Sequence, residues 1–169
     1  MSAHRGWHHI RQVGIALTLA ACALTAEAGM ADLINGVKVG AQLPPAELHF
    51  LSPPPASPRL RLIDFWATWC EPCRESIPAL GVLQTKYAGE GLAVIGVTAE
   101  TLDVVQAFQQ KLPMAYTTAL DSKPGLNSAL HIRALPYAIM VAADGTIVWR
   151  GQPGEIDDAL LRRLLHPAP

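Results

Sequence analysis

Two cysteines separated by two residues, Cys70 and Cys73, are the side chains of this sequence best suited to chemistry. A pair at this spacing can close a disulfide and open it again. Residues 60–65 before the pair read as an apolar strand, followed by a tight turn and a helix that we expect to begin at Cys73. At such a helix N-terminus, free N–H groups and the helix dipole favour an anionic sulfur and lower a thiol pKa from about 8.5 toward neutrality. Pro72 suits the first helical turn, because it needs no N–H partner there.

A Cys-x-x-Cys pair alone is also compatible with metal binding. Zinc takes about four ligands, and the chain has no second cysteine pair. A c-type haem signature requires histidine after the second cysteine, where this chain has Arg74. Redox chemistry is therefore the favoured interpretation, and no metal is expected. A copper(I) metallochaperone that holds the metal through Cys70, Cys73 and a third soft ligand, Met140, is the alternative from a different functional class.

Length, charge and the N-terminal composition limit what the protein does. The chain has 169 residues, of which 50% are apolar, which suits one domain with its own core. The formal net charge of −1, with no basic run, argues against nucleic-acid binding. Residues 1–28 combine early basic residues with an apolar run over 13–24, which is shorter than the ~20 residues needed to span a bilayer. They predict an export signal, so residues 29–169 form the single domain.

Two processing sites compete in this signal, and an uncleaved anchor is the third alternative. Residues 26–28 fit cleavage before Gly29, which would release a soluble periplasmic protein. Residues 19–22 resemble a bacterial lipobox, in which Cys22 would carry the lipid of a membrane lipoprotein. Either route removes Cys22 from thiol chemistry. Cys70 and Cys73 are then the only free thiols in an oxidising compartment.

Hydrophobic patterns predict an α/β fold with a mixed central sheet and helices on both faces. Strands are expected at 47–50, 60–65, 92–97, 116–120, 137–141 and 146–149, with Asp144 and Gly145 in the turn of a final hairpin. Helices are expected after the cysteines as far as Tyr87, from an N-cap at Thr101 to Leu112, over a short turn from Pro124 to Leu130, and across 156–165.

The motif around the cysteines adds a family resemblance. It reads Phe65-Trp66-Ala67-Thr68-Trp69-Cys70-Glu71-Pro72-Cys73-Arg74-Glu75, followed by Ile77-Pro78, by Glu100 after the second central strand, by Leu135-Pro136 and by Asp144-Gly145. From about Gly40 to Leu165 the chain resembles the TlpA/ResA-like thiol:disulfide oxidoreductases of the thioredoxin superfamily. The resemblance implies a thioredoxin fold with an N-terminal extension and no cofactor beyond the redox-active Cys70–Cys73 disulfide.

Roles for the site residues follow from this resemblance. Cys70, the more exposed sulfur, would attack a substrate disulfide, and Cys73 would resolve the mixed disulfide. Pro136 would adopt the cis form opposite the cysteines, and Leu135 before it would pair with the backbone of a bound substrate. Trp66 and Trp69 would shield the site and pack in the core, and Trp69 could also touch substrate.

Two acids, Asp64 and Glu100, are candidate catalytic residues. A carboxyl buried at the end of a strand with few partners should have a raised pKa, so Asp64 could exchange a proton with Cys73. Glu100 matches a glutamate that in ResA-like proteins lies near the cysteines in a cavity that accommodates substrate. Two features depart from that branch: Asp64 stands where asparagine is more common, and Tyr137-Ala138 replaces a Thr-Thr pair.

The resemblance implies an exported reductase of protein disulfides, recharged by a membrane electron donor of a thiol-reducing pathway. Apocytochrome c before haem attachment is the leading substrate hypothesis. A disulfide oxidant or isomerase of the same fold is the enzymatic alternative. We expect a monomer that contacts the membrane only through a lipid on Cys22.

Overall fold

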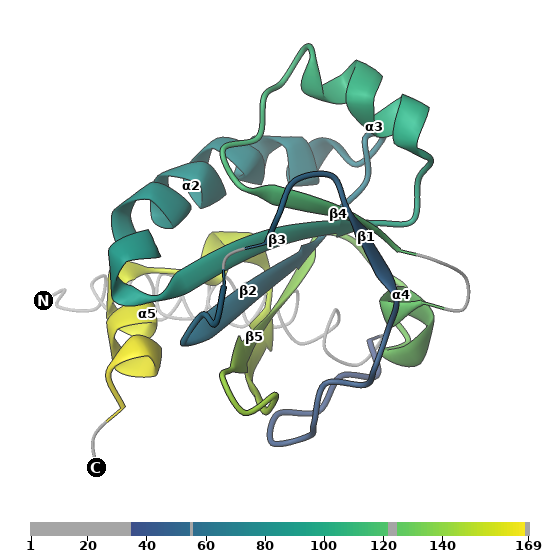
Figure 1. Ribbon diagram of the computed structural model, residues 1–169. Coiled ribbons are helices and arrows are strands. Elements are labelled where there is room, and N and C mark those ends of the chain that lie inside the picture. Colours follow the sequence, from purple (N-terminus) through teal and green to yellow (C-terminus); the bar gives the residue numbers. More distant parts are fainter. Residues whose placement is uncertain (1–34, 55, 122–124, 168–169) are drawn as a thin grey trace, which may run out of the picture.

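The sheet of this protein is mixed and has six strands in the order β1-β4-β3-β2-β5-β6 (Figure 1). The computed structural model describes residues 35–54, 56–121 and 125–167. The central strands β4, β3 and β2 are parallel, while β1, β5 and β6 join antiparallel. The strands are β1 Leu48–Phe50, β2 Leu60–Phe65, β3 Leu92–Thr98, β4 Thr117–Asp121, β5 Tyr137–Ala142 and β6 Ile147–Gly151. The predicted fold class is confirmed.

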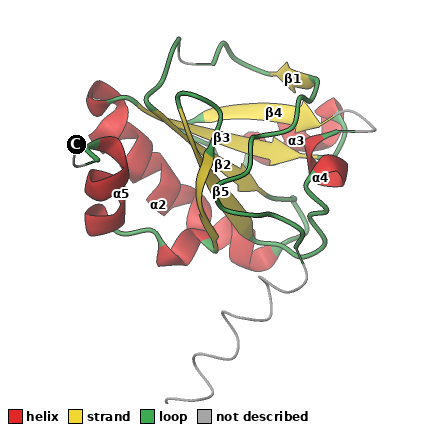
Figure 2. Ribbon diagram, turned by 90° about the horizontal axis from the view of Figure 1, so that it is seen from below, coloured by secondary structure: helices red, strands yellow, loops and turns green. Residues whose placement is uncertain are grey.

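Helices cover both faces of the sheet. They are α2 Glu71–Tyr87, α3 Leu102–Gln109, α4 Leu126–Ala129 and α5 Asp158–Leu165, with short 3₁₀ turns η1 Ala88–Glu90 and η2 Pro153–Glu155. In Figure 1, α2 and α3 lie on one side of the sheet and α4 lies on the other. Figure 2 shows α5 beside α2. The helices α2, α3 and α5 contribute to one apolar cluster, and α4 contributes to the second.

The apolar run of β2 supplies both clusters, because successive side chains of a strand point to opposite faces. Leu60 and Leu62 face the cluster that contains Cys73. Ile63 and Phe65 face the cluster covered by α4. The strand that leads into the cysteines is therefore fixed from both sides.

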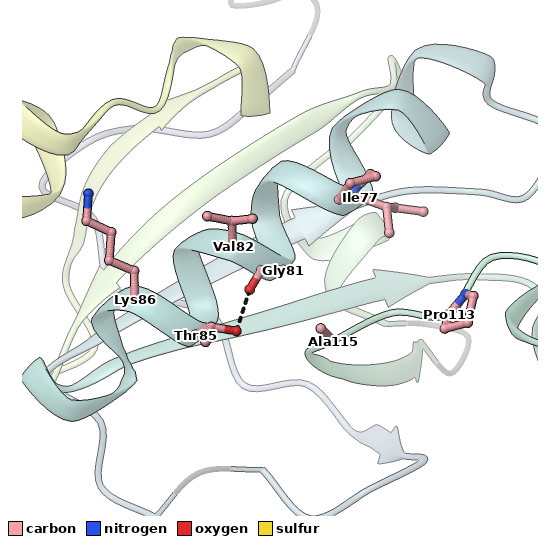
Figure 3. Close-up of a pocket in the computed structure, with 8 residues that line it drawn as sticks. Ile77, Gly81, Val82, Thr85, Lys86, Pro113 and Ala115 are labelled. Atoms are coloured by element: carbon pink, nitrogen blue, oxygen red, sulfur yellow. Dashed lines mark hydrogen bonds between the residues drawn. The ribbon is translucent and has the colours of Figure 1, made fainter.

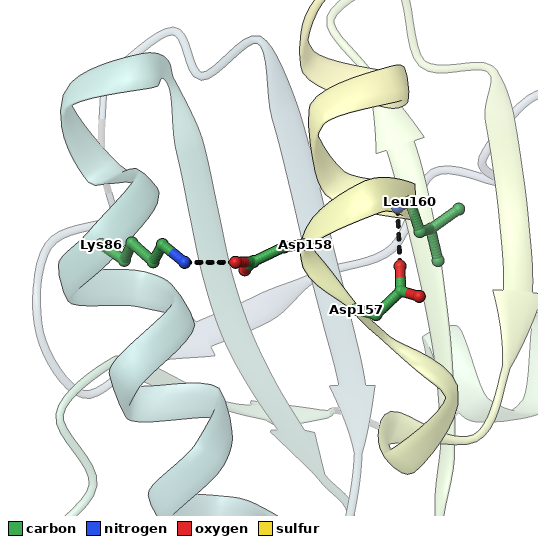
Figure 4. Close-up of polar contacts among 4 residues, drawn as sticks. All are labelled: Lys86, Asp157, Asp158 and Leu160. Carbon is green, nitrogen blue, oxygen red and sulfur yellow. Dashed lines mark hydrogen bonds and ion pairs between the residues drawn. The ribbon is translucent and has the colours of Figure 1, made fainter.

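The contact between α2 and α5 carries a polar pair at the surface (Figure 4). Lys86 of α2 donates to the carboxylate of Asp158 in the first turn of α5. Both side chains are nearly half exposed, so solvent screens the pair and it contributes little to stability. Asp157 caps α5 by accepting from the Leu160 N–H at 2.7 Å, which satisfies one free donor of the helix.

The start of α2 differs from the prediction. The helix begins at Glu71 rather than at Cys73. Cys70 is the N-cap residue, with extended backbone angles, and its carbonyl accepts the first helical hydrogen bond from the Arg74 N–H at 3.2 Å. The Cys70 N–H is bonded to the Ala67 carbonyl at 3.1 Å, which closes the tight turn before the helix. Pro72 lies in the first helical turn, as predicted.

Other boundaries move by one or a few residues. β3 and β4 each extend one residue further than predicted, and β4 also starts one residue later. The short helix α4 begins after Gly125, and Pro124 lies outside the described residues. The predicted export segment 1–28, the lipid site at Cys22 and the cleavage point before Gly29 also lie outside them. In the part of the chain that the structure describes, no helix combines the length and the apolar character needed to cross a bilayer.

Candidate active site

Cys70 and Cys73 form a disulfide at the N-terminus of α2. Cys70 is 4% exposed and Cys73 is fully buried. The order of exposure agrees with the expectation that Cys70 meets the substrate. Because α2 has 17 residues, its N-terminal dipole favours the thiolate form of Cys70 once the disulfide is reduced.

The two tryptophans beside the cysteines have opposite surroundings. Trp66 is 2% exposed and its ring stacks at a tilt on Phe108, with 5.3 Å between ring centroids. Trp69 is 73% exposed. The expectation that Trp69 also packs in the core is wrong, because most of its side chain is exposed to solvent. Trp69 is left as an apolar surface next to the reactive sulfur.

Asp64 is a buried acid without a hydrogen-bond partner. Its side chain is 0% exposed, and both carboxylate oxygens lack a partner among the described residues. It lies between Leu62 and Trp66, so it faces the same cluster as Cys73. Burial raises the pKa of Asp64 from 3.8 to about 7, as the sequence predicts. The carboxyl can therefore gain or lose a proton near neutral pH.

Tyr116 is a second buried polar side chain close to this acid. Its hydroxyl lacks a hydrogen-bond partner within the described part of the chain. Burial, together with the negative charge of ionised Asp64, raises the pKa of Tyr116 above its usual value. The phenol therefore stays protonated, and Asp64 is the group of this pair that titrates near neutrality.

Glu100 accepts hydrogen bonds from the loop that precedes the cysteines. Its Oε2 accepts from the Thr68 N–H and its Oε1 accepts from the Thr68 hydroxyl, each at 2.7 Å. The Thr98 hydroxyl donates to the same Oε2 at 3.3 Å. The structure thus brings Glu100 to the active-site loop, two residues from Cys70. Its contacts hold the loop, whereas the sequence indicated only a general nearness to the cysteines.

Leu135 and Pro136 are joined by a cis peptide bond immediately before β5. Tyr137, the first residue of β5, pairs in register with Phe65, the last residue of β2. The cis proline therefore lies beside the segment that runs from β2 into the cysteines, as the sequence predicts. Leu135 packs against both apolar clusters.

The sequence did not predict the role of two residues in this region, Thr68 and Asn35. Thr68 stands inside the cysteine motif, but its partner Glu100 lies 32 residues away. Asn35 holds the backbone just before Leu135, from 98 residues earlier in the chain. No local pattern marks either contact.

Comparison with known proteins assigns the family. The family model described as Redoxin matches residues 59–165, which contain the cysteines, both acids and the cis proline. The chain belongs to the Redoxin family.

Relatives of this Redoxin chain are named as a thioredoxin-like protein and as thiol-disulfide oxidoreductases. The thioredoxin-like protein YneN of Bacillus subtilis is 31% identical over 121 residues, which cover 66% of the chain and 70% of YneN. The thiol-disulfide oxidoreductase ResA of Bacillus thuringiensis is 28% identical over 87 residues, covering 51% of the chain and 50% of ResA. The match thus spans about half the length of ResA. These matches confirm a ResA-like thiol:disulfide oxidoreductase.

Solved structures agree on the fold. The thioredoxin domain of a thiol-disulfide oxidoreductase from Bacteroides vulgatus superposes with a TM-score of 0.61 at 20% identity, covering 73% of the chain and 91% of that domain. StoA of Bacillus subtilis gives a TM-score of 0.54 at 21% identity, covering 65% of the chain and 84% of StoA. At these identities the likeness shows the thioredoxin fold alone.

A surface groove of this Redoxin chain, shown in Figure 3, has neither cysteine among its lining residues. It has a volume of about 440 Å³ and runs between α2 and the segment 113–115. Val82, Pro113 and Ala115 line it, and the Thr85 hydroxyl is turned back onto the Gly81 carbonyl at 3.0 Å. None of the predicted site residues lines this groove. Within the described residues there is also no cluster of three or more histidine, cysteine or acidic side chains placed to hold a metal ion.

Proposed function

We propose that this oxidoreductase is exported and works as a reductant of protein disulfides. The observation that carries the proposal is the Cys70–Cys73 disulfide at the N-terminus of α2, backed by the unpartnered acid Asp64 on the same side of the sheet. The helix favours a nucleophilic thiolate at the outer cysteine. The acid offers a nearby proton acceptor for the inner cysteine.

The reaction starts from the reduced pair. The Cys70 thiolate attacks one sulfur of the substrate disulfide, which forms a mixed disulfide and releases the other substrate sulfur as a thiolate. The Cys73 sulfur then attacks Cys70, closing the Cys70–Cys73 disulfide and releasing the second substrate thiolate. Two electrons pass from the protein to the substrate. The oxidised pair is the form described above.

Asp64 supplies the proton acceptor in the second step. Cys73 attacks only as a thiolate, so its proton must leave first. With a pKa raised to about 7, Asp64 is ionised in a substantial fraction of molecules at neutral pH and is basic enough to accept that proton. Glu100 is tied to Thr68, so we assign it the separate task of holding the loop.

The substrate would bind along Trp69, Leu135 and Pro136. An extended chain can add to exposed backbone by hydrogen bonding, and the residue before the cis proline is the donor and acceptor that we assign to this pairing. The exposed ring of Trp69 supplies apolar contact beside Cys70.

Location and partners belong to the same proposal. The composition of residues 1–28 supports export, with either a soluble product or a lipid anchor at Cys22. A membrane electron donor of the thiol-reducing pathway would then return the Cys70–Cys73 pair to its reduced form. Apocytochrome c, which the resemblance of the cysteine motif to ResA-like proteins implies, is the leading substrate of this proposal. We propose a monomer that does not bind nucleic acid.

Insulin reduction by dithiothreitol tests the mechanism. The wild-type protein should accelerate it, and Cys70→Ser should remove the acceleration entirely. Residual reduction above the uncatalysed rate in Cys70→Ser would contradict the role of Cys70. A copper(I) titration of the reduced protein separates the metallochaperone alternative, because tight one-to-one binding would support copper transport instead.

A further inference from the structure

The segment between α4 and β5 carries the proposed substrate contact without a helix or strand of its own. It spans residues 130–136 and ends in the cis Leu135–Pro136 bond. His131 has a positive φ of 51°, a left-handed conformation that turns the chain out of α4. Its N–H and that of Ile132 bond back to Ser128 and Asn127. Among the described residues, the N–H groups of Arg133 and Ala134 have no such backbone acceptor.

The side chain of Asn35 provides the acceptor for both of these N–H groups. Its Oδ1 accepts from the Arg133 N–H at 2.7 Å and from the Ala134 N–H at 3.3 Å. The side chain is 3% exposed, so these bonds are protected from competition with water. Because a single oxygen binds two successive N–H groups, it fixes the orientation of the peptide groups that lead directly into Leu135.

The residues after Asn35 hold it in place. A Cβ at Gly36 would lie 3.0 Å from the Cβ of His131, so glycine permits the close approach of the two segments. Val37 is 2% exposed within the second apolar cluster, and its carbonyl accepts from Arg150 at 2.8 Å. The segment 35–37 is thus packed against the turn that precedes the cis proline.

We propose that Asn35 is a positioning residue of the substrate-binding site. By occupying the N–H groups of Arg133 and Ala134, it presents Leu135 as the backbone group available to an extended substrate. This inference rests on the proposed function, in which substrate pairs with Leu135. Asn35 has no part in the chemistry of the cysteines, so its removal should affect binding of polypeptide disulfides and leave the reactivity of the pair unchanged.

Two substitutions of similar size test this role. Asn35→Leu removes the acceptor, whereas Asn35→Asp keeps an oxygen in the same position. With insulin as substrate, Asn35→Leu should raise KM roughly three- to tenfold, because the segment before Leu135 must then be ordered when substrate binds, with kcat nearly unchanged. Asn35→Asp should give a KM closer to that of the wild type. With 2-hydroxyethyl disulfide, which has no backbone to pair, all three proteins should react at the same rate.

The reduction potential of the Cys70–Cys73 pair should be the same in all three proteins. An unchanged KM for insulin in Asn35→Leu would overturn the proposal. Equal losses with both substrates, or a shifted potential, would also overturn it, because they would indicate general damage to the site.

Hydrogen exchange of the backbone amides in the wild-type protein tests the same inference. This measurement does not depend on whether a substituted protein folds. The amides of Arg133 and Ala134 should be protected, and the isolated, alkylated insulin B chain should shift the NMR signal of the Leu135 amide. Free exchange at Arg133 and Ala134 would overturn the role of Asn35. A wild-type protein that does not reduce insulin would contradict the proposed function, but the protection of these two amides would still report on Asn35.

Discussion

Both carboxylate oxygens of Glu100 accept hydrogen bonds from one residue, Thr68, through its N–H and its hydroxyl at 2.7 Å each. Both oxygens of a carboxylate accept hydrogen bonds, and Thr68 supplies one donor for each of them. The contact links the end of β3 to the loop that carries Cys70. These bonds support our proposal that Glu100 holds the loop and that Asp64, whose carboxylate has no partner among the described residues, exchanges the proton.

Substitution of Thr68 tests this support. Thr68→Val removes the hydroxyl bond to Glu100 and keeps the side-chain shape, so it should lower the free energy of unfolding by about 1–2 kcal/mol. It should also slow insulin reduction, because the loop before Cys70 is held less firmly. Denaturant unfolding and insulin turnover measure the two effects. Thr68→Ser keeps the hydroxyl and serves as the control; equal losses in both variants would show that the hydroxyl bond is not the cause.

Asp64 should make stability depend on pH. Its pKa is raised from 3.8 to about 7 in the folded protein, so the folded state holds a proton that the unfolded state has lost between those values. The contribution to stability is complete below about pH 4, falls as pH rises to about 7, and is lost above it. The loss should be on the order of 4 kcal/mol.

Comparison with Asp64→Asn isolates this contribution. The difference in unfolding free energy between the two oxidised proteins should change in favour of the variant as pH rises from 4 to 7, and should be constant above pH 8. Chemical denaturation across this range measures it. A difference that does not vary with pH would mean that Asp64 has an ordinary pKa.

Gly96 should tolerate no side chain. It pairs with Asp64 in the sheet, and a Cβ there would lie 3.0 Å from Trp66 Nε1 and 3.1 Å from both Met114 and Tyr116. Gly96→Ala should destabilise the protein by about 1–3 kcal/mol through overpacking. Gly89→Ala is the matched control, since nothing lies within 4 Å of its Cβ position. A thermal melt in which both variants behave alike would contradict this account.

Cys73→Ser should trap the substrate. Without the second sulfur, the mixed disulfide between Cys70 and substrate cannot be released by internal attack. Incubation of the reduced variant with a disulfide-bonded protein should therefore give a covalent adduct visible on a non-reducing gel. Cys70→Ser should give far less adduct, because Cys73 is fully buried. Equal trapping by the two variants would contradict the assignment of Cys70 as the nucleophile.

Regular elements were well predicted, because their signals are local. The apolar run 60–65 coincides with β2, and the turn at Asp144-Gly145 joins β5 and β6 as expected. The start of α2 was wrong by two residues. Cys70 acts as the N-cap through its backbone alone, and its side chain makes no capping hydrogen bond, so the sequence offers no capping signal at that point.

The sequence predicted the burial of one candidate site residue but not the contacts of others. Burial of Asp64 followed from its place at the end of an apolar strand. The partners of Glu100 and Asn35 could not be predicted, because each bond joins segments that are distant in sequence and adjacent only after folding. The exposure of Trp69 was not predicted, because a large apolar residue type normally indicates burial.

The equilibrium reduction potential of the Cys70–Cys73 pair, measured against a glutathione or dithiothreitol series, tests the central claim most directly. A reductant of protein disulfides should have a potential below roughly −220 mV, toward the thioredoxin end of the scale. A potential near roughly −120 mV would mean that the reduced form is strongly stabilised. The protein would then be an oxidant, and the proposed direction of electron flow would be contradicted.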